Sequence, residues 1–346
     1  MALLEIKNLH TYFETRRGLI KAVYGVNLKV EEGKTLGVVG ESGSGKSQTA
    51  MSILKLFEKN QRIFEGEIWF NGKRISDYTD RELQKIRGND ISFIFQEPMT
   101  SLNPVFTVEH QLNEVLILHQ NLSKKEASKK SVRLLEMVKI PNPHIVVKQY
   151  PFQLSGGMNQ RVMIAMALAC EPRLLIADEP TTALDVTIQA QILKLMNELK
   201  ETQKASIMFI THDLGVINQM ADDVAVMYCG QVVESAPVDY IFREGISEYS
   251  HPYTEALLES IPSISTDKNK RLNAIPGSVP HPFALPQGCR FAPRCRYATE
   301  LCRSKMPELQ VFNDGKQEIR CFYPEKGVRN QVRRSEERRV GKECRS

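Results

Sequence analysis

The feature that most constrains this chain is a glycine-rich stretch, GESGSGKS, at residues 40–47. It matches the pattern G-x-x-x-x-G-K-[ST] of a phosphate-binding loop (P-loop) at every fixed position. An apolar stretch, residues 35–39, precedes it, and a helix-compatible stretch, residues 47–56, follows it. That order is the context in which the pattern binds phosphate, because loop N–H groups and the helix N-terminus then point at the anion. A merely flexible turn would not explain the Lys-Ser ending.

The residues of the loop have separable expected roles. Lys46 reaches the β- and γ-phosphates of a nucleotide, and the Ser47 hydroxyl ligates Mg²⁺. The residues expected to bind ATP in this segment are Gly40, Ser42, Gly43, Ser44, Gly45, Lys46, Ser47 and Gln48. A P-loop alone leaves kinases, GTPases, helicases and transporters open.

A second motif narrows this choice. Residues 174–179, LLIADE, form a buried-strand pattern that ends in two carboxylates. Asp178 at the strand tip is placed to hold Mg²⁺ through water, and Glu179 can polarise an attacking water. An Asp-Glu pair at a strand end is otherwise common and usually solvated, so the neighbouring motifs have to decide.

Four further motifs follow a fixed order. Gln96 comes after an apolar stretch at residues 91–95, LSGG stands at residues 154–157, PTTALD at 180–185, and a strand pattern ends in THD at 211–213. The set resembles the ATP-binding cassette (ABC) ATPase family. The resemblance implies an α/β fold: a P-loop NTPase (RecA-like) cassette with a helical subdomain. A small-molecule kinase would not account for residues 154–157.

The resemblance also implies roles for individual residues. The expected catalytic residues are Glu179, His212 as the switch histidine and Gln96 as the Q-loop glutamine, and the expected Mg²⁺ ligands are Ser47, Gln96 and Asp178. Leu184 and Asp185 correspond to the D-loop. Ser155, Gly156 and Gly157 correspond to the signature that binds the γ-phosphate held by an opposite subunit. Met158 stands where glutamine is usual, but the expected contacts come from the serine and the backbone.

An adenine-stacking aromatic residue is expected upstream of the P-loop. Tyr12 and Phe13 are both suitable, and strand alternation lets only one of them face the base. We favour Phe13.

Composition restricts where the chain can act. No uncharged apolar run approaches the ~20 residues that span a bilayer, and Glu5, Lys7 and His10 interrupt any signal-peptide core. The net charge of +5 is local: residues 327–346 contain seven Lys/Arg and three Glu, which gives +4 and leaves about +1 for the rest. A near-neutral body lacks the basic stripe that nucleic-acid binding needs.

The 346 residues, 42% of them apolar, suit two domains. We expect a nucleotide-binding domain at residues 1–248 with its helical subdomain at about 97–160, and a C-terminal extension at 249–326. Prolines rule out long helices in that extension. Residues 327–346 read as a disordered tail, whose last dozen residues are equally compatible with native and with vector-derived sequence.

The extension contains four clustered cysteines, Cys289, Cys295, Cys302 and Cys321. Clustered thiols in a cytosolic protein favour metal binding over disulfides. Their spacing matches neither the short C-x2-C hairpins of structural zinc sites nor the ferredoxin runs, so it leaves zinc, an iron–sulfur cluster and free thiols open.

Three segments of the extension, at residues 251–258, 275–278 and 288–295, resemble the C-terminal extension of ATPases of the dipeptide, oligopeptide and nickel importers. Some members of that subfamily carry a [4Fe–4S] cluster on four cysteines there, so the resemblance implies these four as ligands. With the cassette, the resemblance covers about residues 1–325.

The function that the resemblance implies is hydrolysis of ATP to drive import of di- or oligopeptides. The cofactors would be ATP, Mg²⁺ and the [4Fe–4S] cluster. The partners would be a second ABC ATPase subunit, identical or homologous, two transmembrane permease subunits and, indirectly, an extracytoplasmic solute-binding protein, with no nucleic acid. The expected location is the cytoplasmic face of the cell membrane. Nickel or another small solute is the alternative cargo, and a soluble ABC ATPase acting on nucleic acid or ribosomes is the alternative class.

Overall fold

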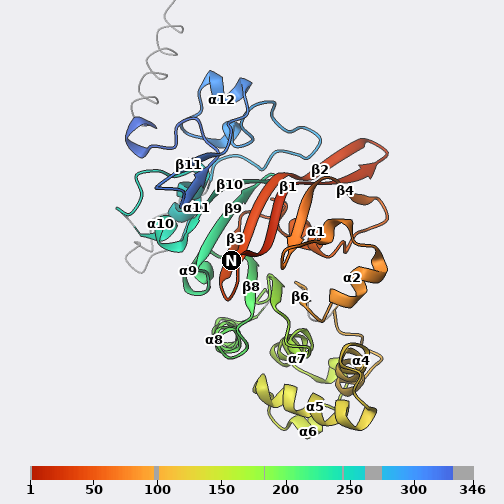
Figure 1. Ribbon diagram of the computed structural model, residues 1–346. Helices are drawn as coiled ribbons and strands as arrows, with labels where there is room; N and C mark the ends of the chain where they lie inside the picture. Colours follow the sequence, from red (N-terminus) through yellow and green to blue (C-terminus); the bar gives the residue numbers. More distant parts are fainter. Residues whose placement is uncertain (1, 97–100, 183, 244, 262–274, 330–346) are drawn as a thin grey trace, which may run out of the picture. The chain divides into compact units, whose positions relative to one another are not determined.

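The structure of the chain is a computed structural model that describes residues 2–96, 101–182, 184–243, 245–261 and 275–329 (Figure 1). It divides into two compact units, each assembled from segments far apart in the sequence. The helical unit comprises Met1–Glu5, Lys29–Leu36 and Ile68–Thr211. The P-loop unit comprises Ile6–Leu28, Gly37–Glu67 and His212–Ser346. The start of the predicted helical subdomain, residues 97–100, and most of the predicted tail, residues 330–346, lie outside the described residues.

The chain passes from one unit to the other within four strands. These are β1 (Ala2–Thr15), β2 (Gly18–Glu31), β3 (Thr35–Val39) and β4 (Gln61–Phe70). All five residues of β3 are buried, whereas β1 and β2 mix buried and exposed positions. A continuous apolar run is typical of a strand covered on both faces, and β3 leads directly into the P-loop.

An antiparallel sheet organises the C-terminal half of the P-loop unit. Its strands lie in the order β9 (Asp223–Tyr228), β10 (Gln231–Pro237), β12 (Gln317–Ile319) and β11 (Gln310–Phe312). The helices of this unit are α1 (Lys46–Ile53), α9 (Leu214–Met220), α10 (Val238–Phe242), α11 (Pro252–Glu259), η3 (Ala292–Arg294) and α12 (Glu300–Ser304). The described helices after residue 249 are short, as the prolines predict.

Three parallel strands form the centre of the helical unit. They are β6 (Ile91–Ile94), β7 (Leu174–Asp178) and β8 (Ser206–Thr211), with β7 between the other two. Every residue of β7 and β8 is buried. Because the strands are parallel, their carboxyl ends lie at the same edge of the sheet, where parallel sheets place functional side chains.

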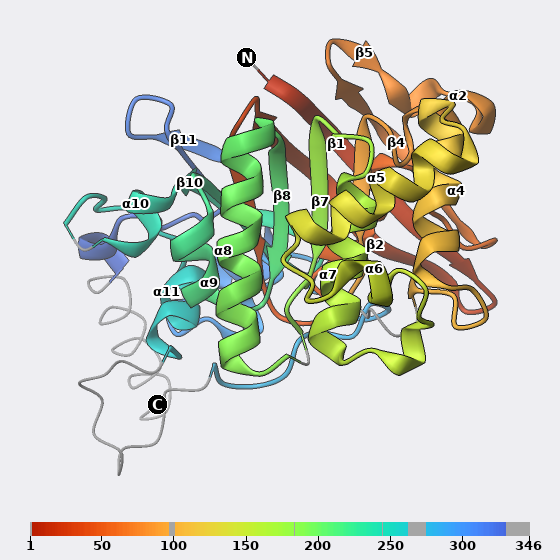
Figure 2. The ribbon, with the colours of Figure 1, turned by 90° about the horizontal axis from the view of Figure 1, so that it is seen from below.

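In the helical unit, α7 and α8 lie on one side of these strands, with α8 along β8 (Figures 1 and 2). The helical segments are η1 (Ile75–Asp77), α2 (Asp80–Ile86), α4 (Val108–Gln120), α5 (Lys124–Met137), α6 (Pro143–Val146), η2 (Pro151–Gln153), α7 (Gly156–Leu168) and α8 (Val186–Gln203). Five of the described ones begin with a side-chain cap, from Thr79, Thr107, Ser123, Ser155 and Asp185. Such caps satisfy N–H groups that a helix cannot pair internally.

A two-residue hairpin turn within residues 70–73 connects β4 to the next strand. Strand β5 (Lys73–Arg74) pairs with the end of β4, with Phe70 opposite Lys73. Asn71 and Gly72 between them both have positive φ, 49° and 73°. That is the turn in which Asn-Gly is strongly preferred.

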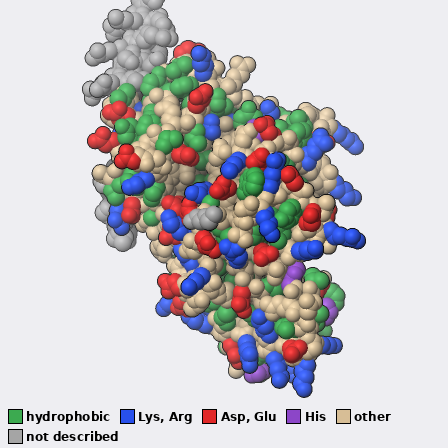
Figure 3. All heavy atoms as spheres, viewed as in Figure 1, with side chains coloured by type: hydrophobic (Ala, Val, Ile, Leu, Met, Phe, Trp, Pro, Cys, Tyr) green, Lys and Arg blue, Asp and Glu red, His purple; other side chains and the backbone are tan. Residues whose placement is uncertain are grey.

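No helix in the described part of the chain is both long and apolar enough to span a bilayer. On the face shown in Figure 3, basic and acidic side chains are intermingled rather than segregated. This face therefore agrees with the near-neutral charge calculated for residues 1–326.

Candidate functional site

The P-loop lies between β3 and α1, as the sequence predicts. Gly40 and Gly45 have φ values of 152° and 99°, which favour glycine. A Cβ at Gly40 would collide with the carbonyl oxygen of Met227, and one at Gly45 would lie 2.5 Å from the carbonyl oxygen of Ala22. Glycine is therefore required at both positions by close backbone approach as well as by conformation.

The lysine of the loop is held inside the curve that the backbone makes. Lys46 is 5% exposed, and its Nζ donates to the carbonyl oxygens of Gly40 at 2.7 Å and Glu41 at 3.0 Å. The Ser44 carbonyl oxygen accepts from the N–H of Gly230, in the β9–β10 turn, at 2.7 Å. The loop is thus fixed by its own lysine and by a neighbouring turn of the P-loop unit.

The other predicted nucleotide-binding residues occupy the same loop and the start of α1. Ser42 and Gly43 are exposed, whereas Ser47 and Gln48 are half-buried. The Gln48 carbonyl Oε1 accepts from Gln61 Nε2 at 2.6 Å. The exposed part of the loop is therefore its outer turn, at Ser42 and Gly43.

The two candidate adenine-stacking residues differ in their surroundings. The Tyr12 ring lies 4.7 Å from the Phe64 ring between centroids, and its hydroxyl is 2.8 Å from His10 Nδ1. Burial raises the pKa of Tyr12, and that of His10 is lowered by burial. Phe13, the next residue of β1, is half-buried and points to the opposite side of the strand. Phe13 stays the predicted stacking residue.

In the helical unit, the structure brings the predicted glutamine and glutamate together. Gln96 follows β6, Glu179 follows β7, and Gln96 Nε2 donates to Glu179 Oε2 at 3.2 Å. The Thr182 hydroxyl donates to the same Glu179 oxygen at 2.9 Å. The shared edge of parallel strands explains why residues 83 positions apart meet.

Glu179 also has an unusual backbone. Its φ is 46°, in the left-handed region that non-glycine residues rarely adopt. Its N–H donates to the Ile210 carbonyl oxygen at 2.9 Å, and its carbonyl oxygen accepts from the Thr182 N–H at 3.1 Å. Strained residues of this kind cluster at functional sites.

The remaining predicted residues of this edge lie at strand ends. Asp178 is the last residue of β7 and is 2% exposed. His212 directly follows β8 and is exposed. Gln96, Asp178 and Glu179 belong to the helical unit, whereas His212 and the P-loop belong to the P-loop unit.

The predicted signature begins α7. The Ser155 hydroxyl accepts from the Met158 N–H at 3.3 Å, so Ser155 caps this helix through the backbone of the residue that departs from the usual signature. Gly157 packs closely on α8: a Cβ there would lie 2.9 Å from Ile188 Cγ2. Asp185 of the predicted D-loop caps α8 by accepting from the Ile188 N–H at 2.9 Å. The structure therefore brings the signature and the D-loop side by side.

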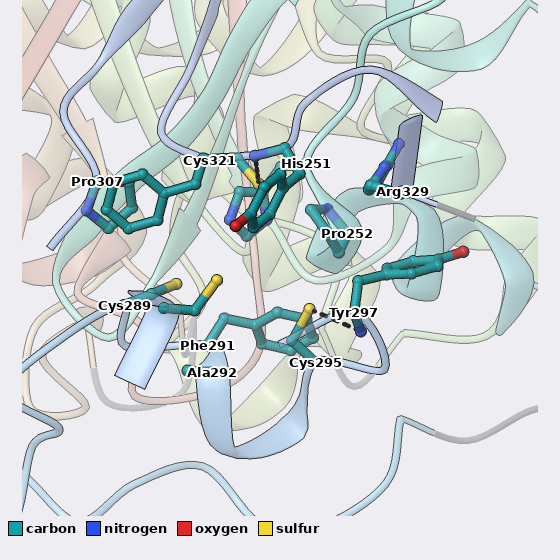
Figure 4. Close-up of a pocket in the computed structure, with 13 residues that line it drawn as sticks. His251, Pro252, Cys289, Phe291, Ala292, Cys295, Tyr297, Pro307, Cys321 and Arg329 are labelled. Atoms are coloured by element: carbon teal, nitrogen blue, oxygen red, sulfur yellow. Dashed lines mark hydrogen bonds between the residues drawn. The ribbon is translucent and has the colours of Figure 1, made fainter. Parts of the chain in front are cut away.

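The four predicted cysteine ligands line one cavity of the P-loop unit (Figure 4). Burial raises the pKa of the Cys289 thiol, and it raises those of Cys295 and Cys321 to about 12. Three of the sulfurs accept hydrogen bonds: Cys295 from the Tyr297 N–H at 3.4 Å, Cys321 from the Tyr323 N–H at 3.4 Å, and Cys302 from the Thr299 hydroxyl at 3.5 Å.

These residues fit a metal or cluster by chemistry, but the cavity is small. Four thiols, three of which accept hydrogen bonds at sulfur, are the ligand set of an iron–sulfur or zinc–thiolate site. The cavity is only ≈ 20 Å³, close to the room that one water needs. Within the described ranges, no three Cys, His, Asp or Glu side chains are placed to hold one metal ion. Binding would therefore require the thiols to move.

The sequence did not indicate two of the contacts described by the structure. Thr182 shares the Glu179 oxygen with Gln96, although its motif, PTTALD, was recognised. Glu41, a variable position of the P-loop pattern, forms an ion pair with Arg294 of the C-terminal extension. Arg294 lies within a recognised segment, residues 288–295, but nothing in the sequence connects it to the P-loop.

The fold and these motifs define a P-loop ATPase. Residues 23–182 match the ABC transporter family, and residues 233–302 match the family described as oligopeptide/dipeptide transporter, C-terminal region. Over 328 residues the chain is 54% identical to the oligopeptide transport ATP-binding protein AppD of Bacillus subtilis, which covers 94% of this chain and 98% of that protein. Over 323 residues it is 49% identical to the oligopeptide transport ATP-binding protein OppD of Escherichia coli, with 93% and 94% covered.

A solved structure agrees with this assignment. The ATP-binding cassette MJ0796, in a dimeric post-hydrolysis state bound to ADP and Pi, aligns with a TM-score of 0.62 and 31% identity over 68% of this chain and 98% of that one. The chain belongs to the ABC transporter family and is an ATPase of that family. The predicted fold, and the predicted resemblance to peptide-importer ATPases, are confirmed.

Proposed function

We propose that this chain is the ATP-hydrolysing subunit of an importer for di- or oligopeptides. The observation that carries the proposal is the match of residues 233–302 to the C-terminal region of oligopeptide/dipeptide transporters. The identity to AppD extends through the same region, because 94% of this chain is covered. This similarity in the C-terminal region supports peptides as the transported solute.

The P-loop would bind the phosphates of ATP. Residues 42–45 offer backbone N–H groups at the start of α1, and Lys46 supplies a positive charge for the β- and γ-phosphates. Gln48 follows in α1, and Phe13 would stack on the adenine. The support is the buried Lys46 inside a loop whose outer turn, at Ser42 and Gly43, is exposed.

The helical unit would supply the general base and the groups that orient it, and the P-loop unit would supply His212 and Ser47. Glu179 would act as general base on the attacking water, and Gln96 and Thr182 orient its carboxylate through hydrogen bonds of 3.2 and 2.9 Å. His212 would contact the γ-phosphate. Mg²⁺ would neutralise phosphate charge, and Ser47, Gln96 and Asp178 offer the oxygen ligands that this ion prefers.

Hydrolysis would need a second ATPase subunit, identical or homologous. Ser155, Gly156 and Gly157 would bind the γ-phosphate held by the partner's P-loop, and Asp185 would lie at the same interface. Ser155 and Gly156 are exposed at the N-terminus of α7, which supports this role. The structure of MJ0796, a dimeric cassette, is a precedent among similar proteins.

We further propose that the subunit works at the cytoplasmic face of a membrane, against two permease subunits fed by a solute-binding protein. The helical unit has an apolar surface suited to such docking. Phe106, Ile117 and Leu118 are 41%, 41% and 70% exposed on and before α4. Ile117 and Leu118 line a groove with His110 and Lys124. Neighbouring exposed apolar residues of this kind mark interaction surfaces.

The test is transport by the reassembled importer. The chain, its permeases and its solute-binding protein would be placed in vesicles, and ATP-dependent uptake of a dipeptide, an oligopeptide and Ni²⁺ compared. Uptake of either peptide supports the proposal. Uptake of Ni²⁺ alone would show that the cargo is nickel and not a peptide. ATPase activity that responds only to nucleic acid or ribosomes would show that the chain is a soluble ABC ATPase and not an importer subunit.

We also propose that residues 1–248 form the nucleotide-binding domain and that residues 249–326 form the C-terminal extension. Within the extension, Cys289, Cys295, Cys302 and Cys321 would hold a [4Fe–4S] cluster that staples a segment poor in regular structure. The support is the meeting of four thiols from separate segments at one cavity, three of them with hydrogen-bond donors.

Metal analysis tests the cluster. Protein purified without air is expected to contain about four irons and four sulfides per chain and to be brown. Cys302→Ser should lose both, whereas Cys170→Ser, a control outside the cavity, should keep them. Stoichiometric zinc without iron or sulfide would contradict the cluster and support a zinc site, and metal-free protein would contradict both.

A further inference from the structure

Glu41, the second residue of the P-loop, is held at its N–H, its carbonyl and its side chain. Its N–H donates to the Tyr253 hydroxyl at 2.9 Å. Its carbonyl oxygen accepts from Lys46 Nζ at 3.0 Å and from the Ser44 N–H at 3.2 Å. Its carboxylate receives both terminal nitrogens of Arg294, at 2.6 and 3.0 Å. The conformation of this turn therefore depends on two side chains from the C-terminal extension.

Arg294 is itself fixed from several directions. Its side chain is 4% exposed, whereas that of Glu41 is 30% exposed. Its Nε donates to the Pro276 carbonyl oxygen at 3.0 Å, and its guanidinium lies 5.8 Å from the centre of the Tyr228 ring. The hydrogen bond to Glu41 is the largest cause that raises the pKa of Arg294. Because the guanidinium is already held in place, little side-chain conformational entropy is lost when it binds the Glu41 carboxylate.

An aromatic cluster supports both contacts. Tyr228, Tyr253 and Phe291 are at most 3% exposed, and their ring centroids lie 4.6 to 5.3 Å apart. Phe291 precedes η3, whose last residue is Arg294. Aromatic residues packed in this way are rigid, so the Tyr253 hydroxyl and the Arg294 guanidinium have set positions.

We propose that Arg294 and Tyr253 are positioning residues for ATP: they hold Glu41 so that the first turn of the P-loop keeps its phosphate-binding form. The proposal rests on the proposed nucleotide-binding role of the P-loop. Without the contacts from Arg294 and Tyr253, the Glu41 carbonyl oxygen that accepts from Lys46 is held only from within the loop, by the Ser44 N–H. The lysine and the loop N–H groups must then be ordered by ATP itself, at a cost in affinity.

The alternative is that the ion pair only fastens the extension to the rest of the unit. The chain provides a control for this. Arg296, two residues further on, donates through both terminal nitrogens to Glu259, so it also makes a two-point ion pair, with both partners inside the extension. Arg296→Met should lower stability slightly and leave ATP binding unchanged. A P-loop effect is thereby separated from a stability effect.

The experiment measures the Kd of a fluorescent ATP analogue and the thermal stability of the full-length chain. Arg294→Met keeps the packing of the stem and should weaken binding about tenfold, because a charge-assisted contact orders the loop. Arg294→Lys should lie between Arg294→Met and the wild type, since an ammonium cannot make both bonds. In steady-state assays KM should rise, while kcat at saturating ATP stays within about twofold.

Two further variants guard against misfolding. Glu41→Gln and Tyr253→Phe remove the same contacts with nearly unchanged shape, and each should weaken ATP binding. Arg294→Met combined with Glu41→Gln should bind no more weakly than Arg294→Met alone, because both remove one interaction. The proposal would be overturned if the double variant lost affinity by the product of the two single losses. It would also be overturned if a folded Arg294→Met chain bound ATP with wild-type affinity. If the wild-type chain itself fails to bind ATP, the proposed function is wrong instead.

Discussion

The P-loop and the signature turn are both helix N-termini suited to phosphate, but different contacts hold them. The signature turn is supported locally: Ser155 caps its own helix, and Gly157 packs against Ile188 of α8 in the same unit. The P-loop is supported from afar, since Glu41 contacts Tyr253 and Arg294, which are 212 and 253 positions away. The signature turn is therefore held by residues near it in the sequence, whereas the P-loop is also held by residues near the C-terminal end of the chain.

The difference separates two kinds of function. Residues of the helical unit, such as Glu179 and Ser155, are expected to affect turnover more than affinity. Residues of the P-loop unit, such as Lys46 and Arg294, are expected to affect affinity more than turnover. Substitutions at these positions therefore test whether affinity and turnover depend on different units.

The largest effect is expected at Glu179. Glu179→Gln keeps the shape and the neighbours Gln96 and Thr182 but removes the general base, so kcat should fall by about 10²–10⁴-fold. The Kd of ATP should stay close to the wild-type value. Single-turnover hydrolysis and equilibrium binding measure the two quantities, and near-normal hydrolysis would remove Glu179 from the role of base.

Ser155→Ala is expected to have the next largest effect. Loss of one preorganised hydrogen-bond donor to the γ-phosphate should lower kcat about 10²–10³-fold. Ser123→Ala is the matched control, because Ser123 caps α5 in the same unit with Glu126. The control should cost about 1 kcal/mol of stability and leave ATP hydrolysis unchanged.

A mixing experiment shows whether Ser155 acts across a dimer. Glu179→Gln and Ser155→Ala chains are each expected to be nearly inactive. In a mixed dimer, one site would combine the intact Glu179 of one chain with the intact Ser155 of the other. Activity that appears on mixing supports the shared site, whereas a mixture as inactive as its components means that Ser155 serves its own chain.

A smaller effect, on affinity, is expected at Lys46. Lys46→Ala removes a cation from the phosphates and should weaken ATP binding about 10–100-fold, the range of lost charge-assisted hydrogen bonds. Calorimetric titration with ATP would measure it, with Lys55→Ala, just after α1, as a control. If Lys46→Ala lowered kcat while Kd stayed unchanged, the expectation that residues of the P-loop unit affect affinity more than turnover would be wrong.

Local features of this fold could be predicted from the sequence. The Asn71–Gly72 turn follows from residues that tolerate positive φ, and the buried strand at Leu174–Asp178 follows from its apolar run. Ser155 could be predicted to open its helix because serine side chains cap N-termini. Each of these depends on a few consecutive residues.

Contacts between distant segments could not be predicted in the same way. The pattern of the P-loop leaves the position of Glu41 open, so its ion pair with Arg294 has no signature in the sequence. Cysteine spacing gave the four residues that meet at one cavity but not the size of that cavity. The positive φ of Glu179 is likewise imposed by its surroundings, since the side chain does not favour it.

The distance between Glu41 and Arg294 has a consequence in time. Synthesis at roughly 5–20 residues per second needs about 13–50 s to cover the 253 positions that separate them. Throughout that interval the nascent chain contains a P-loop whose first turn lacks the ion pair between Glu41 and Arg294. Pairing over such a separation is also slow to form. A chain released by the ribosome before residue 294 would therefore contain the complete P-loop sequence and still lack the arginine that holds Glu41 in place.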